Sequence, residues 1–302
     1  MKSMWSDEEA QRYVERYAQQ GVNADIALRV YTSRLLGRDP ALVLHGGGNT
    51  SVKTQVPDQL GRPVDVLCVK GSGWDMAEIE PAGLPAVKMA PIVELRALSK
   101  LSDEDMVNAQ RINLLDSSAP NPSVETLLHA FLPHKFIDHT HAIAVLSVSD
   151  QPDGDARCRY LYGKRMGHVP YIMPGFQLAK KAAEVYESDP SVEGLILEKH
   201  GIFTFGDSAR EAYERMIEKV TLAEDRLRKS RKSVFAPASL PARCAAVADV
   251  APILRGIMAR CDKPGTMHRM VMDFRCSPLI LNYVNGRDVA RYSQVGVVTP
   301  DH

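Results

Sequence analysis

The fold is decided by one stretch, residues 122–142, PSVETLLHAFLPHKFIDHTHA. A Pro-Ser pair opens it, and the apolar positions that follow recur at intervals of three and four. This spacing predicts a helix over residues 124–131, with Glu125 in its first turn. The Ile- and Val-rich segment at 136–148 then predicts a β-strand.

The strand predicted at 136–148 carries two histidines, His139 and His141, separated by one residue. Side chains alternate along a strand, so both imidazoles project from the same face and can share one ion. His200 is the third candidate ligand, because it lies between an apolar strand and a glycine, where a packing histidine has little reason to be. Three neutral imidazoles that leave a coordination position open are typical of a catalytic metal site. The alternative for the pair is a half-exposed strand edge, and His129 and His134 are less favoured as ligands.

Two glycine-rich turns, GGGN at 46–49 and GSG at 71–73, follow apolar segments that predict strands at 42–44 and 64–69. Such turns expose backbone N–H groups that can cradle an anion. Lys70 adds a positive charge beside the second turn. Neither turn matches a Walker or dinucleotide-binding fingerprint. The alternative is that both are only tight turns.

Glu125 is the candidate general base, because the start of a short helix can hold a carboxylate rigidly. The alternative is an ordinary first-turn glutamate that interacts with the helix dipole. The local sequence alone does not choose between the two.

The other helices and strands are predicted from periodicity and turn residues. The other predicted elements are two helices over 6–36 broken near Gly21, a helical region at 84–115, strands at 194–197 and 202–205, a helix capped by Asp207 and running to about 227, a linker at 234–243, a helix at 247–258, and two short strands near 271 and 280. This pattern predicts a main domain over residues 1–233 and a linker with a small extension over 234–302.

Composition excludes several classes of protein. The 37 basic and 37 acidic residues cancel, so neither nucleic acid nor an anionic membrane is expected as a partner. The sequence has neither the roughly 18 uninterrupted apolar residues of a membrane-spanning helix nor the layout of a signal peptide. The five cysteines are scattered and without a Cys-x-x-Cys pair, which favours reduced thiols and a cytoplasmic location.

Taken together, these segments resemble the class II aldolase/adducin family of metal-dependent sugar-phosphate aldolases. The matching segments are GGGNTS at 46–51, KGSG at 70–73, PSVETLLHAFLP at 122–133, DHTHA at 138–142 and EKHGIFTFGDSAREAY at 198–213. They occur in the family's order and cover most of residues 25–230. The resemblance implies an α/β fold of three layers, with a central, mainly antiparallel sheet between helices, and a small C-terminal α+β extension.

The resemblance also implies roles for particular residues. His139, His141 and His200 would bind Zn²⁺ or another divalent metal, and Glu125 would be the acid/base. The residues that would hold the substrate and its phosphate are Gly48, Asn49, Ser72, Gly73 and Ser123, and Lys70 is added to them because of its charge beside the second turn. The second of the family's two phosphate-binding serines is replaced here by Val124. The candidates for the family's tyrosine proton donor are Tyr160, Tyr162 and Tyr171.

The implied reaction is retro-aldol cleavage of a ketose 1-phosphate, similar to rhamnulose or fuculose 1-phosphate, to dihydroxyacetone phosphate and a small aldehyde. Family members are commonly homotetramers, so a tetramer is expected. The same fold hosts epimerases, decarboxylases, dehydratases and adducin-like scaffolds. A glutamate at 125 favours an aldolase over an epimerase, which has aspartate there, and the complete set of three histidines speaks against a scaffold.

Within the family, the chain looks most similar to the aldolase half of bifunctional rhamnulose-phosphate aldolase/alcohol dehydrogenases, in which a short-chain dehydrogenase follows. The sequence stops at His302, about where that second half would begin. No nucleotide-binding fold is predicted within it, so dehydrogenase activity is not expected of these residues.

Overall fold

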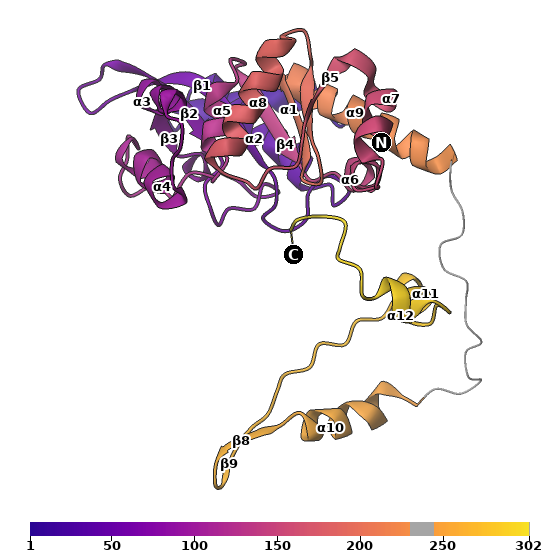
Figure 1. Cartoon of the computed structure of the whole chain (residues 1–302). Helices are drawn as coiled ribbons and strands as arrows, with labels where there is room; N and C mark the ends of the chain where they lie inside the picture. Colours follow the sequence, from indigo (N-terminus) through magenta and orange to yellow (C-terminus); the bar gives the residue numbers. More distant parts are fainter. Residues whose placement is uncertain (230–244, 302) are drawn as a thin grey trace. The chain divides into compact units, whose positions relative to one another are not determined.

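The computed structural model describes residues 1–229 and 245–301 of the chain (Figure 1). The chain divides into two compact units, one of residues 1–230 with 297–302 and the other of residues 231–296. All the candidate site residues belong to the first unit. The predicted linker at 234–243 and the predicted domain boundary after residue 233 lie outside the described residues, so both stay predictions.

The first unit is built on a seven-stranded sheet with the strand order β3-β2-β1-β4-β7-β6-β5. Its strands are β1 Asn49–Pro57, β2 Pro63–Val69, β3 Ala86–Lys88, β4 Phe136–Thr140, β5 Met166–Val169, β6 Gly194–Leu197 and β7 Gly201–Gly206. β5 runs parallel to β6, and the other neighbouring strands pair antiparallel. The mainly antiparallel sheet implied by the resemblance is therefore confirmed.

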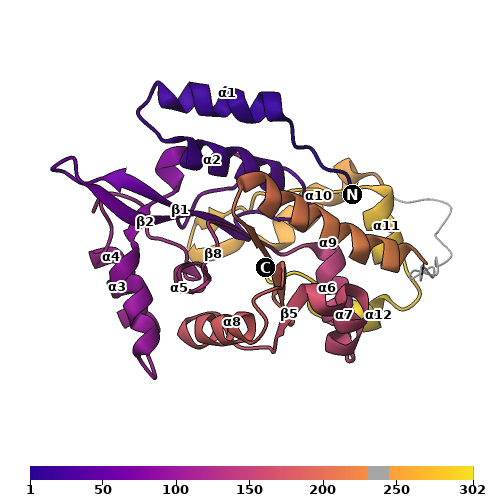
Figure 2. The same ribbon diagram turned by 90° about the horizontal axis from the view of Figure 1, so that it is seen from above.

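Helices cover both faces of this sheet. They are α1 Asp7–Ala18, α2 Ala24–Gly37, α3 Met89–Glu94, α4 Asp103–Ile112, α5 Thr126–Phe131, α6 Ile143–Ser149, α7 Gly154–Tyr162, α8 Phe176–Ser188 and α9 Ala209–Lys229, with short 3₁₀ turns at Pro81–Gly83, Leu95–Ala97 and Gly163–Arg165. Figure 2 shows α1, α2 and α9 on one side of the strands and α5 and α8 on the other. Leu127 of α5 and Phe176 of α8 belong to the core on one face, and Tyr213 and Val220 of α9 to a core on the opposite face. The three-layer arrangement is thus confirmed.

The first two helices form where the sequence predicts them. Ser6 caps α1, because its hydroxyl accepts a hydrogen bond from the Glu9 backbone N–H, and Asn23 caps α2 in the same way. Gly21 lies between the two helices with a φ of +74°, a conformation that ends a helix at little cost when the residue is glycine.

The strand predicted at residues 42–44 is wrong, because β1 begins after the glycine turn, at Asn49. The opening positions of β1 are polar but buried, since their side chains find partners inside the protein. The Thr50 hydroxyl lies 2.7 Å from that of Ser33, and the Ser51 hydroxyl lies 2.7 Å from the ring of His129. A search for apolar alternation misses a strand of this kind, because hydrogen bonds offset the cost of burying its polar groups.

Two other long predictions need correction. β4 ends at Thr140, and residues 143–148, predicted as its continuation, lie in α6, because a short apolar run fits a buried helix as well as a strand. The region 84–115 is not one helix but the edge strand β3 followed by α3 and α4. The cap of α9 is Ser208 rather than Asp207, since the Ser208 hydroxyl accepts from the Glu211 N–H at 3.1 Å.

The second unit contains α10 Val247–Ile257, the hairpin strands β8 Arg260–Lys263 and β9 Thr266–His268, α11 Pro278–Val284 and α12 Val289–Tyr292. The predicted helix at 247–258 is confirmed, but the strands predicted near 271 and 280 are wrong. Ile280 lies in α11, which Ser277 caps and Pro278 opens. Across the described parts of both units, no helix is long and apolar enough to cross a membrane.

Candidate active site

Three histidines from distant parts of the chain converge at one end of the central strands. His139 is the fourth residue of β4, His141 follows that strand, and His200 lies in the turn between β6 and β7. The Nε2 atoms of His139 and His141 are 3.0 Å apart, and one nitrogen from each of the three rings lies within 4.8 Å of the others. The His139 ring also stacks on Phe203 of the paired strand β7, at 4.2 Å between ring centroids. The cluster is therefore held by the pairing of β4 with β7.

Hydrogen bonds define which nitrogens of these rings are available. His139 Nδ1 lies 3.1 Å from the carbonyl of Ile202, and His141 Nδ1 lies 2.6 Å from the carboxylate of Asp301. Both acceptors are oxygen atoms without a hydrogen, so each Nδ1 donates, and Nε2 is the nitrogen of each ring that can offer a lone pair to a cation. Burial lowers the pKa of His139 well below its ordinary value and also lowers the pKa of His200. The pKa shifts favour the neutral, metal-binding form of these two rings.

A divalent cation fits this set of donors. Two Nε2 lone pairs facing each other at 3.0 Å repel unless a positive group lies between or beside them. His200 Nδ1 and Glu125 Oε1 are buried and make no hydrogen bond within residues 1–229 and 245–301. Leaving buried polar atoms unsatisfied costs about 1–3 kcal/mol each, so the site is arranged for a ligand. Three imidazoles with room for further ligands match the preference of zinc.

The carboxylate of Glu125 lies directly beside the histidines. Glu125 occupies the position just before α5 rather than its first turn, and its side chain is only 6% exposed. Its Oε2 lies 3.4 Å from His139 Nε2, and its Oε1 lies 3.4 Å from His200 Nε2. Glu125 would thus be within reach both of a cation held by the histidines and of a molecule bound to such a cation.

A chain of buried hydrogen bonds fixes the Glu125 carboxylate. Asn49 Nδ2 donates to Glu125 Oε2 at 2.6 Å, and Asn49 Oδ1 lies 2.5 Å from His129 Nε2. Since the amide oxygen only accepts, His129 Nε2 donates, and its Nδ1 accepts from the Ser51 hydroxyl at 2.7 Å. Burial, with help from the nearby Lys53, lowers the pKa of His129 well below its ordinary value, so the ring stays neutral. His129, which the sequence made a less favoured metal ligand, therefore orients the amide that holds Glu125.

A buried ion pair lies behind the three histidines. Arg29 of α2 and Asp138 of β4 are both fully buried, with 2.5 Å between guanidinium and carboxylate. The same guanidinium donates to the carbonyls of Ser51 and Ile137 at 3.2 and 3.3 Å. Arg29 therefore ties β1 to β4 at the level of the site.

The two glycine turns meet at one cavity of about 380 Å³. Its lining includes all six residues expected to hold the substrate, Gly48, Asn49, Lys70, Ser72, Gly73 and Ser123, together with Glu125, His141 and His200. Lys70 joins the turns, because its Nζ donates to the Gly46 carbonyl at 3.0 Å, and burial lowers the pKa of its ammonium. Gly48 has a φ of +63°, and a Cβ there would lie 2.7 Å from the His139 carbonyl, so glycine is required. The turns and the histidines thus form one site.

One residue of the site escaped the sequence analysis. Asp301, whose side chain is 2% exposed, is 160 positions from its partner His141. Pro300 lines the cavity beside it, and Thr299 is buried. A lone aspartate near the end of the sequence carries no local pattern that could have revealed this contact.

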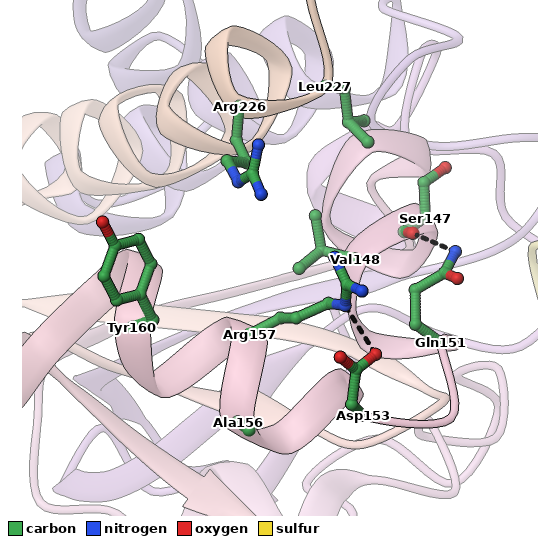
Figure 3. Close-up of a pocket in the computed structure, with 9 residues that line it drawn as sticks. All are labelled: Ser147, Val148, Gln151, Asp153, Ala156, Arg157, Tyr160, Arg226 and Leu227. Carbon is green, nitrogen blue, oxygen red and sulfur yellow. Dashed lines mark hydrogen bonds and ion pairs between the residues drawn. The ribbon is translucent and has the colours of Figure 1, made fainter. Parts of the chain in front are cut away.

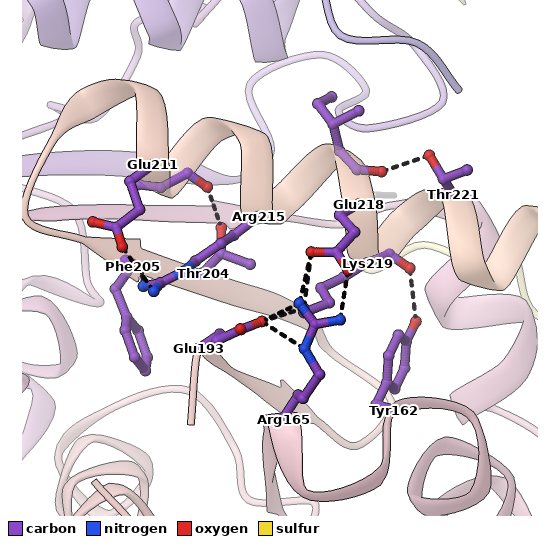
Figure 4. A network of polar contacts seen from close by, with 12 residues as sticks. Tyr162, Arg165, Glu193, Thr204, Phe205, Glu211, Arg215, Glu218, Lys219 and Thr221 are labelled. Atoms are coloured by element: carbon purple, nitrogen blue, oxygen red, sulfur yellow. Dashed lines mark hydrogen bonds and ion pairs between the residues drawn. The ribbon is translucent and has the colours of Figure 1, made fainter. Parts of the chain in front are cut away.

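The three candidate tyrosines lie elsewhere in the first unit. Tyr160 lines a separate hollow of about 490 Å³ formed by α6, α7 and α9 (Figure 3) and is 86% exposed. Tyr162 is buried, and its hydroxyl donates to the Lys219 carbonyl at 3.3 Å, beside the ion pairs that join Arg165 and Glu193 to α9 (Figure 4). The Tyr171 hydroxyl lies 3.1 Å from the Met173 sulfur. None of the three lines the cavity at the histidines within the described chain.

Fold and site together define an α/β protein with a three-histidine candidate metal centre and an adjoining carboxylate. Residues 27–227 match the Class II Aldolase and Adducin N-terminal domain, and residues 245–302 match the second domain of class II aldolases. The chain therefore belongs to the class II aldolase/adducin family.

Relatives of the chain support this assignment. It is 35% identical over 280 residues to the uncharacterized oxidoreductase YuxG of Bacillus subtilis, a match that covers 90% of this chain and 40% of that protein. The chain thus spans about two fifths of the length of this curated relative. Its fold is similar to the N-terminal class II aldolase domain of a conserved Thermoplasma acidophilum protein, with 39% identity, a TM-score of 0.67, and 75% of this chain and 99% of that chain covered. A sugar-phosphate aldolase from Thermotoga maritima shares the fold at 16% identity and a TM-score of 0.52, with 69% of this chain and 97% of that chain covered.

Proposed function

We propose that the protein is a metal-dependent aldolase that cleaves a ketose 1-phosphate, similar to rhamnulose or fuculose 1-phosphate, to dihydroxyacetone phosphate and a small aldehyde. The observation that carries the proposal is the position of Glu125, 3.4 Å from two of three clustered histidines and facing the cavity between the glycine turns. Membership of the class II aldolase family supports a carbon–carbon lyase.

The metal would be held by His139, His141 and His200, and Zn²⁺ is the ion that this ligand set favours. A bound divalent cation supplies a Lewis acid against which negative charge can develop on a substrate oxygen when the carbon–carbon bond breaks. The chain itself contributes neutral imidazoles, because burial lowers the pKa of His139 and His200.

Glu125 would move the proton at the substrate carbon. Its Oε2 is fixed by Asn49, while its Oε1 is buried and without a hydrogen bond in the described chain, so this second oxygen is available to substrate. In the cleavage the hydroxyl on the far side of the broken carbon–carbon bond loses its proton and becomes the aldehyde oxygen, while the bonding electron pair stays on the carbon of the dihydroxyacetone phosphate fragment. Overall one proton passes from that hydroxyl to this carbon, and Glu125 would deliver it. General acid–base catalysis of this kind contributes typically about 10²- to 10⁴-fold to a rate.

The two glycine turns would receive the phosphate. Lys70 lies in the cavity wall between them, and the hydroxyls of Ser72 and Ser123 line the same space. Burial lowers the pKa of the Lys70 ammonium. A dianionic phosphate bound there would give this ammonium a partner of opposite charge and so favour its charged form. Val124, in the place of a second serine, is 51% exposed and supplies no hydrogen bond from its side chain.

The decisive experiment compares Glu125→Gln with the wild-type protein, both loaded with zinc. Release of dihydroxyacetone phosphate from rhamnulose and fuculose 1-phosphates is followed with a coupled assay, and bound zinc is measured in the same samples. We expect the variant to keep its zinc and lose turnover by about 10²- to 10⁴-fold. Glu104→Gln, an exposed substitution on α4, is the matched control.

Other results would change the assignment. A turnover unaffected by Glu125→Gln would remove this residue from the mechanism. Epimerised product or carbon dioxide without aldehyde would assign a different reaction to the site. Equal kcat/KM for the phosphorylated and unphosphorylated ketoses would contradict the phosphate site, whereas a preference that Lys70→Met abolishes would support it.

The proposal includes a homotetramer in the cytoplasm. Four cysteines of the described chain, Cys68, Cys158, Cys261 and Cys276, are free thiols, which suits a reducing compartment. Light scattering on the purified protein tests the assembly, with an expected mass four times the 33.3 kDa of one chain. A mass of one or two chains would contradict the tetramer.

A further inference from the structure

The last residues of the described chain return to the candidate metal centre. Residues 297–302 belong to the first unit, although the second unit precedes them in the sequence. Asp301 Oδ1 lies 2.6 Å from His141 Nδ1, and the two side chains are 2% and 11% exposed. This is a charge-assisted contact largely shielded from water, so it is stronger than a surface ion pair.

The contact controls the part of His141 that would bind a cation. With Nδ1 donating to the Asp301 carboxylate, the Nε2 lone pair of the ring points at His139 Nε2, 3.0 Å away. A carboxylate on the far nitrogen fixes the tautomer and the orientation of an imidazole ligand, and makes that ligand more basic. His139 obtains the same tautomer from the Ile202 carbonyl, which is fixed by the sheet. His141 lies beyond the end of β4, so its tautomer and orientation depend on the side chain of Asp301 instead.

Room for this carboxylate comes from one glycine of the first turn. A Cβ added at Gly47 would lie 1.7 Å from Asp301 Oδ1 and 2.6 Å from its Cγ. A Cβ added at the preceding Gly46 would meet nothing within 4 Å. A side chain at Gly47 would therefore collide with the Asp301 carboxylate, whereas a side chain at the neighbouring Gly46 would not.

We propose that Asp301 is a positioning residue for the metal centre, holding His141 with its Nε2 directed at the cation. The segment 299–301 then links the end of the described chain to metal affinity. The inference rests on the proposed function only in that the three histidines bind a cation. It requires neither a particular substrate nor a particular reaction.

Zinc affinity of the whole chain is the direct test, measured by competition with a chromogenic chelator. Removing such a partner of a metal ligand weakens metal binding by typically about 10- to 100-fold, and we expect this loss for Asp301→Asn. Gly47→Ala should weaken zinc binding in the same way, because its methyl group displaces the carboxylate without removing the charge from the chain. Gly46→Ala and Asp249→Asn, an exposed position on α10, should bind zinc as the wild type does.

A second readout reports the contact itself. In ¹⁵N-edited NMR spectra, the Nδ1–H of His141 should give a strongly downfield proton signal that Asp301→Asn and Gly47→Ala shift upfield and Gly46→Ala preserves. This signal can be followed without zinc, so the two proposals fail separately. A wild-type chain that binds no zinc overturns the proposed metal site. Zinc affinities within twofold of wild type for both Asp301→Asn and Gly47→Ala overturn the role of Asp301 and leave the proposed reaction intact.

Discussion

Substituting Gly201 by alanine should perturb the proposed metal centre through the backbone, without changing any of the three histidines. Gly201 opens β7 directly after His200. A Cβ there would lie 2.5 Å from the Thr140 carbonyl, 2.9 Å from His139 Cε1 and 3.2 Å from His141 Cδ2. Cβ atoms essentially never come within 3.0 Å of another heavy atom, so the strand or the rings must move by at least the difference, 0.5 Å. A displacement of about 0.5 Å is the limit within which a functional site tolerates movement.

The magnitude follows from the cost of overpacking. An extra methyl group in a tightly packed place costs about 1–3 kcal/mol. Since 1.4 kcal/mol corresponds to a factor of ten, displacement of the imidazoles would weaken zinc binding by about 5- to 150-fold. If the rings stay in place instead, the same strain lowers the free energy of unfolding. The melting temperature then falls by about 2–4 °C for each kcal/mol in a unit of this size.

Zinc competition and thermal melting, with and without zinc, separate these two outcomes. Gly46→Ala is the matched control, since its Cβ enters open space beside the same site. A Gly201→Ala protein with wild-type zinc affinity and wild-type melting temperature would refute the packing of β7 against the histidines.

Three further predictions concern residues that support the site or the fold around it. His129→Phe leaves the two partners of this buried ring, Ser51 and Asn49, unsatisfied and should cost about 2–6 kcal/mol of unfolding free energy in denaturant melts; a loss under 1 kcal/mol would contradict this chain of buried hydrogen bonds. Arg29→Met strands the buried carboxylate of Asp138 and should cost about 3–5 kcal/mol, whereas the double variant with Asp138→Leu should recover most of this loss, and failure to recover would count against the ion pair. Burial lowers the pKa of His168 to about 4, so below about 6.5 the unfolded chain takes up a proton that the folded chain refuses. The free energy of unfolding should therefore fall by roughly 1–2 kcal/mol between pH 6.5 and 4 because of His168. This range is smaller than the full pKa difference would give, because the residue is partly exposed to solvent. His168→Asn should lessen that fall relative to the exposed His268→Asn, and identical pH profiles would contradict it.

Local patterns predicted the elements that carry the candidate ligands. The apolar strand and the one-residue spacing around His139 and His141 sufficed to predict that both rings lie on one side. His200 was marked by its place between an apolar strand and a glycine. Apolar periodicity did not predict the strand where the buried residues are polar, as in the opening residues of β1. The hydroxyls of Thr50 and Ser51 can be buried there because they form hydrogen bonds with residues far away in the sequence. It failed again at residues 143–148, where an apolar run is compatible with either a helix or a strand.

Contacts between residues far apart in the sequence could not be predicted from local patterns. His129 reaches Asn49 across 80 positions, and Asp301 reaches His141 across 160. Each residue looks ordinary in its own segment, a histidine on an apolar helix and an aspartate after a proline. Their roles arise only when the sheet brings β1, α5 and the final residues together.

The central claim is that three imidazoles of one chain hold a single divalent cation. Zinc content after exhaustive dialysis, measured by inductively coupled plasma mass spectrometry, tests this most directly. The account predicts one zinc per chain for the wild type and for the exposed control His268→Ala, and less than a tenth of that for His139→Ala. Substoichiometric zinc in the wild type, or full zinc retained by His139→Ala, would contradict it.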